Sequence, residues 1–103
     1  MIKYNKLVRD NIPDIIHAQE KKTVIHIADH GEYQRKLLEK LQEEVAKYTH
    51  IQQNEELADV LEVLHALAKV HDASFADIEK IRTKKAKERG GFEKRIILDE
   101  ADA

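Results

Sequence analysis

The chain has 103 residues and a mass of 12.0 kDa, with 37% charged and 42% hydrophobic residues and a formal net charge of −2. This balance predicts no specific nucleic-acid binding, and the lack of cysteine excludes disulfides, cysteine-ligated zinc and a thiol nucleophile. No apolar run approaches the roughly 18 residues of a membrane span, and the N-terminus has no signal-peptide core. We therefore expect one cytoplasmic domain over residues 1–103, small enough that a partner subunit is expected.

The N-terminal part predicts one short helix and one strand. Asn11 can cap a helix over residues 12–20, and Pro13 is tolerated in its first turn because the missing N–H needs no partner there. Residues 23–28 are β-branched and bounded by charged residues, which predicts a short strand. The apolar residues 96–98 are its expected partner, giving a two-stranded ribbon.

Three longer helices follow. Apolar residues at every third or fourth position predict a helix over residues 30–52, and Asn54 is expected to cap the next, which should be central because apolar residues cover over half of it. Ser74 and Asp77 form a capping-box pattern that starts the last helix, which should end at Gly90. The predicted fold is all-α, an antiparallel helical bundle with a small two-stranded β ribbon.

Carboxylates occupy positions on the second and third helices where a soluble helix is usually apolar. At about 100° per residue, Glu44 falls on the apolar face of the second helix, whereas Glu43 points away from it. On the third helix, Glu56 and Asp59 are spaced so that both can reach one ion. Because an inward carboxylate must be paired or hold a cation, Glu44, Glu56 and Asp59 are candidate ligands of Mg²⁺ or Mn²⁺.

Two other interpretations of these acids stay open. They could pair with Lys40, Lys47 or a basic residue of another helix, or they could line grooves open to solvent. The six histidines are scattered, which argues against a histidine-ligated metal. The basic run over residues 82–95 is typical of a solvated face, yet with Lys6 and Arg9 it could hold a polyphosphate.

Four blocks of the chain, taken in order, carry a family resemblance. They are YNKLVRDNIP at 4–13, KLQEEV at 40–45, EELADVLEVL at 55–64 and KAKERGGF at 85–92. Together they resemble the small "KLVRD…IP", phosphoribosyl-ATP-pyrophosphohydrolase-like branch of the MazG-like, all-α nucleoside triphosphate pyrophosphohydrolases. The resemblance implies Mg²⁺-dependent hydrolysis of a nucleoside triphosphate to the monophosphate and pyrophosphate, in a house-cleaning role, by a homodimer or homotetramer.

The resemblance also implies roles for individual residues. The family's E-x-x-D pair of metal ligands corresponds to Glu56 and Asp59, and the first acid of its E-x-x-E pair corresponds to Glu44. The candidate catalytic carboxylates are Glu43 and Glu44, with Glu62 as an alternative to Glu43. The residues expected to bind the substrate phosphates are Lys6, Arg9, Lys85 and Arg89.

Lys47 departs from the family pattern, because it stands where the second acid of E-x-x-E is expected. Its ammonium group could replace one cation and leave a weakened metal site in an active enzyme. Alternatively it neutralises Glu44 or Asp59, and the chain is a catalytically silent nucleotide-binding or oligomerisation protein of the same fold. The sequence leaves the base and sugar of the nucleotide open.

Overall fold

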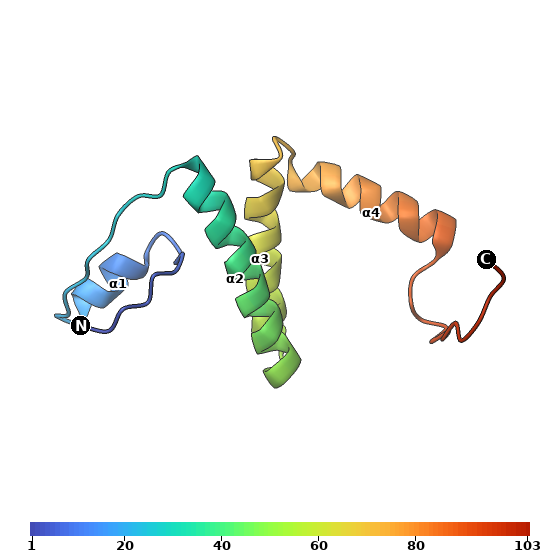
Figure 1. The fold of residues 1–103 in the computed structure, drawn as a ribbon, viewed down its shortest axis with the longest axis horizontal. Helices are drawn as coiled ribbons and strands as arrows, with labels where there is room; N and C mark the ends of the chain where they lie inside the picture. The colour runs from blue at the N-terminus through green and yellow to red at the C-terminus, as the bar shows by residue number, and fades with distance from the viewer.

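The computed structural model describes residues 1–103 as an all-α chain without strands. Its helices are α1 (Ile12–Ala18), α2 (His30–Ile51), α3 (Asn54–Val70) and α4 (Phe75–Arg89). Figure 1 shows α2 and α3 side by side as an antiparallel hairpin, with α1 to one side and α4 projecting away to the other. None of the helices combines the length and apolar character needed to cross a membrane.

The hairpin forms because a two-residue link reverses the chain between α2 and α3. Gln52 takes a left-handed conformation with φ 53°, and its N–H donates to the carbonyl of Tyr48 at 2.8 Å. Gln53 is extended and occupies the N-cap position of α3 without a side-chain hydrogen bond. The prediction that Asn54 caps this helix is therefore wrong, because Asn54 is already its first helical residue.

A second turn sets the direction of α4. Asp72 is left-handed with φ 53°, and Ser74 and Asp77 form the predicted capping box. Phe75 stacks on the ring of His65 in α3 with their centroids 3.8 Å apart. The helix thus meets α3 at this junction and then diverges from it (Figure 1), ending at Gly90 as predicted.

The single chain does not close a compact core. Its buried residues are Leu37, Glu44, Val63 and Ala68, all in the α2–α3 hairpin. The radius of gyration is 18.2 Å, whereas a compact chain of this length has about 13 Å. The fold class is therefore the predicted one, but within one chain the bundle consists of a hairpin with two outlying helices.

The predicted β ribbon is absent, which corrects the sequence-based expectation. Residues 23–28 and 96–98 are irregular, and Val24 and Ile97 are largely exposed. Figure 1 shows why: the first segment leads into α2 and the second lies beyond α4, on opposite sides of the hairpin. A strand needs a neighbour to satisfy its backbone groups, and neither segment has one within the chain.

A candidate acidic site between helices α2 and α3

The chain ahead of α1 is tied to the hairpin by two ion pairs. Lys6 Nζ donates to Glu43 Oε1 on α2 at 2.9 Å, and the Arg9 guanidinium donates to Asp59 Oδ1 on α3 at 2.8 Å. Both basic residues were predicted to bind phosphate, and both acids were predicted to serve the reaction or the metal. The structure pairs each of the two basic residues with one of the two acids.

Glu44 is the most deeply buried of the predicted acids, with a side chain only 5% exposed. Its Oε1 lies 3.1 Å from Lys40 Nζ, which also donates to Glu43 Oε2 at 3.1 Å. Burial opposes the charged form of Lys40, but its hydrogen bonds to both glutamates outweigh burial and raise its pKa. The pairing of an inward acid with Lys40, one of the open interpretations, is therefore present.

Glu43 is held ionised by the basic side chains around it. The hydrogen bond from Lys6, supported by Lys40 and opposed by burial, lowers the pKa of Glu43 from 4.5 to about 2. A general base works best when its pKa lies near the working pH. While Lys6 is bound to it, Glu43 is thus a poor acceptor for a proton from water.

Lys47 lies at the rim of the site. Its Nζ is 3.7 Å from Glu43 Oε1 and 3.7 Å from Glu44 Oε1, and its side chain is 49% exposed. It contacts neither Asp59 nor Glu56 as an ion pair. Lys47 therefore neutralises the two glutamates of its own helix from a half-solvated position, where a long side chain can also swing outward.

Two carboxylate oxygens at the site are buried and have no hydrogen-bond partner: Glu44 Oε2 on α2 and Glu56 Oε2 on α3. A buried acceptor left without a partner costs about 1–3 kcal/mol, so each requires an explanation. Mg²⁺ commonly takes one or two carboxylates and completes its shell with waters and substrate phosphates. As hard carboxylate oxygens, these two atoms are ligands of the kind that such an ion binds.

Asp59, predicted as the third ligand, does not join them. No three acidic or histidine side chains converge on a common point. Asp59 is turned to Arg9 and its side chain is 42% exposed. Asp59 is thus engaged as an ion-pair partner of Arg9.

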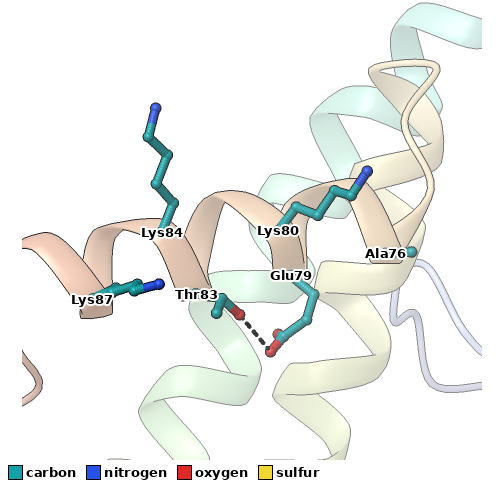
Figure 2. Close-up of a pocket in the computed structure, with 6 residues that line it drawn as sticks. All are labelled: Ala76, Glu79, Lys80, Thr83, Lys84 and Lys87. Atoms are coloured by element: carbon teal, nitrogen blue, oxygen red, sulfur yellow. Dashed lines mark hydrogen bonds between the residues drawn. The ribbon is translucent and has the colours of Figure 1, made fainter.

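The other two predicted phosphate ligands, Lys85 and Arg89, are not at the site. They lie on α4, which leads away from the hairpin, and both are exposed (Figure 1). Figure 2 shows the side chains of Lys80, Lys84 and Lys87 on the same helix. At 100° per residue these three positions lie on another side of α4 from Lys85 and Arg89. These three exposed lysines, the lysine face of α4, agree with the solvated face that the basic run suggested.

Comparison with known proteins adds no relative: no family model, curated protein or solved structure matches the chain. The case for a function therefore depends on the acidic site. Its defining features are the two buried carboxylate oxygens without a hydrogen-bond partner, and the basic side chains that pair with Glu43 and Asp59.

Proposed function

We propose that this protein is a Mg²⁺-dependent nucleoside triphosphate pyrophosphohydrolase of the MazG-like, all-α class. It would convert its substrate to a nucleoside monophosphate and pyrophosphate as a homodimer or homotetramer. The observation that carries the proposal is the pair of buried oxygens, Glu44 Oε2 and Glu56 Oε2, on adjacent helices. The resemblance of four sequence blocks to that class supplies the substrate.

The proposed role of each acid follows from its surroundings in the structure. Glu44 and Glu56 would hold Mg²⁺ or Mn²⁺, because their free oxygens are hard donors out of contact with water. A bound ion would neutralise phosphate charge and lower the pKa of a bound water. Asp59 and Glu43 stand beside them but are occupied by cations of the N-terminal segment.

A triphosphate would compete with the carboxylates for Lys6 and Arg9. Arginine can bind phosphate through two parallel hydrogen bonds and lysine as a point charge, so both would transfer from a carboxylate to a more highly charged ligand. Removing Lys6 from Glu43 would let the pKa of Glu43 rise towards its ordinary value. In this way binding of the substrate would release Asp59 as a metal ligand and Glu43 as a group that positions or deprotonates water.

A second candidate function is a catalytically silent nucleotide-binding protein of the same fold. The observation in its favour is that Glu43, Glu44 and Asp59 each already have a lysine or arginine partner. Such a protein would bind a nucleotide through its basic side chains without cleaving it. It would therefore show stabilisation by nucleotides and no turnover.

The decisive measurement is pyrophosphate release from a panel of ribo- and deoxynucleoside triphosphates with Mg²⁺ or Mn²⁺. The Glu56→Gln and Asp59→Asn variants should fall to background. Glu55→Gln is the matched control, because Glu55 is an exposed neighbour in the first turn of the same helix and should keep its activity. Full activity in Glu56→Gln would contradict the metal assignment and with it the proposal.

Lys47→Glu separates the two candidate functions. It replaces an ammonium near Glu44 with the acid that the family pattern has there, so an enzyme limited by that lysine should gain activity. A silent binder should show no turnover in either form, while ATP still raises the melting temperature of the original chain. That outcome would contradict the proposed hydrolase activity and support the catalytically silent nucleotide-binding protein.

A further inference from the structure

The first 18 residues of the chain, the N-terminal arm, share no buried core with the rest of the fold. The arm consists of residues 1–11 and helix α1, and none of its residues is buried. Helix α1 packs against none of the other three helices, and Figure 1 shows it standing apart from the α2–α3 hairpin. The arm is therefore not held on the hairpin by hydrophobic packing of its helix.

Three polar contacts hold the arm against the hairpin instead. Two are the ion pairs of Lys6 and Arg9 described above, at 2.9 and 2.8 Å. The third is a hydrogen bond of 2.7 Å that Lys36 Nζ on α2 donates to the carbonyl of Asn5. The side chains of Lys6 and Arg9 are 40% and 57% exposed. Ion pairs so open to water are weak and are screened by salt, so the attachment of the arm depends on ionic strength.

The link between the arm and α2 lets the arm move away while the hairpin stays folded. Side-chain hydrogen bonds from the link to α2 come from His26 and Asp29, next to the start of that helix. The remaining residues of the link, 19–25, span up to about 23 Å when extended. All buried residues of the chain lie in the hairpin, so its packing does not include the arm.

The docked arm places two positive charges beside the candidate metal ligands. Lys6 binds Glu43, which directly precedes the candidate ligand on α2. Arg9 binds Asp59, which lies about one helical turn from the candidate ligand on α3. A divalent cation carries the same total charge. The arm thus supplies from within the chain the counter-charge that such a cation would bring.

Lys40 couples the arm to the buried acid on α2. Its Nζ donates to Glu43 Oε2 at 3.1 Å and lies 3.1 Å from Glu44 Oε1, so the two acids share one ammonium group. When Lys6 leaves Glu43, the same two acids have one basic side chain fewer. Glu44 is then neutralised less completely and attracts an external cation more strongly.

We infer that the N-terminal arm is a detachable inhibitor of the acidic site, in which Lys6 and Arg9 act as internal counter-ions. The docked arm and a divalent cation each weaken the binding of the other, because they neutralise the same group of acids. The detachment of the arm stands on the contacts alone. The inhibition of cation binding rests on the proposed function, because it requires a metal site at Glu44 and Glu56.

Fluorescence energy transfer within one chain tests the detachment in the absence of metal and nucleotide. The chain has no cysteine, so Ile15→Cys/Leu38→Cys places a donor and an acceptor dye at exposed positions of α1 and α2. Labelled chain is diluted into excess unlabelled chain, so that transfer between copies is not recorded. Raising NaCl from about 0.1 M to 1 M shortens the screening length from about 10 Å to 3 Å. The transfer efficiency should fall, while circular dichroism at 222 nm shows the hairpin still folded.

Charge variants identify the contacts responsible. Adding Lys6→Met/Arg9→Met to the labelled chain should give the low transfer efficiency already at the lower salt concentration. Lys3→Met/Lys22→Met is the matched control, because it removes two exposed lysines that have no ion-pair partner, and it should behave as the labelled chain without it. A transfer efficiency that responds neither to salt nor to Lys6→Met/Arg9→Met would overturn the detachment.

Calorimetric titration with Mn²⁺ alone tests the inhibition without an assay of activity. The Lys6→Met/Arg9→Met variant should bind Mn²⁺ at least about fivefold more tightly than the original chain, the lower end of the usual coupling between two sites. The Lys3→Met/Lys22→Met control should match the original chain. Equal affinity in all three would overturn the inhibition and leave the metal site standing. Mn²⁺ binding by none of them would contradict the proposed function and the inhibition together, whereas the energy transfer decides the detachment separately.

Discussion

Replacing Lys40 with methionine should reveal how much the buried acid on α2 costs when its best partner is removed. Glu44 is 5% exposed, and Lys40, whose side chain is 17% exposed, lies 3.1 Å from it. Methionine keeps most of the volume of lysine but has no charge and no hydrogen-bond donor. The only other cation on Glu44 is Lys47, at 3.7 Å and half solvated.

The expected loss follows from this geometry. Removing one partner of a buried ion pair costs about 3–5 kcal/mol, because the other charge stays desolvated. Lys47 still compensates part of the charge of Glu44, so we expect Lys40→Met to lower the free energy of unfolding by about 2–3 kcal/mol. Lys40→Met/Glu44→Gln should recover most of this loss, because it removes both charges together.

Urea unfolding followed by circular dichroism at 222 nm, at pH 7 and without divalent cations, measures these differences. Lys84→Met is the matched control, because Lys84 is 77% exposed and only 4.0 Å from Glu88, and such surface pairs contribute about 1 kcal/mol or less. The reasoning fails if Lys40→Met is no less stable than Lys84→Met. It also fails if the double variant is no more stable than Lys40→Met alone.

Two further predictions concern a surface ion pair and a helix cap. The folded-state pKa of Glu43, about 2, lies below its ordinary value of 4.5, so its contribution to stability is complete above pH 4.5 and is lost as the pH falls towards 2. Lys6→Met should therefore flatten the decline in the free energy of unfolding between pH 6 and pH 3, measured by urea unfolding at each pH, by about 1 kcal/mol after screening; an unchanged decline would argue against the Lys6–Glu43 pair. Ser74→Ala removes the acceptor of the Asp77 N–H and should weaken the first turn of α4 by about 1 kcal/mol, seen as faster amide exchange there. Unchanged exchange would contradict the role of the cap.

The helices were predictable because their signals are local. Helix α2 ends one residue before its predicted limit, and the capping box at Ser74 and the stop at Gly90 are as predicted, since each depends on neighbours within one turn. The absence of the predicted ribbon between residues 23–28 and 96–98 could not be foreseen from their β-branched content. Strand formation depends on a partner far along the chain, and the two segments lie on opposite sides of the hairpin.

The site shows the same division between local and long-range information. The inward position of Glu44 followed from helical periodicity within α2. The contacts of Lys6 with Glu43 and of Arg9 with Asp59 span 37 and 50 residues and start from an irregular segment, so no periodicity predicts them. The contact with Lys6 is nevertheless the largest cause of the low pKa of Glu43.

These contacts make the site electrically neutral before any ligand arrives. Four carboxylates are balanced by four basic side chains, counting the acids Glu43, Glu44, Glu56 and Asp59 against Lys6, Arg9, Lys40 and Lys47. An acid at position 47 would change this balance by two charges, so the lysine reduces the demand for a divalent cation. Under the proposed function, a triphosphate that draws Lys6 and Arg9 away leaves the four carboxylates and the two remaining lysines with a net charge of −2. One Mg²⁺ neutralises this charge. The cation and the nucleotide would then bind together, each creating the charge that the other needs.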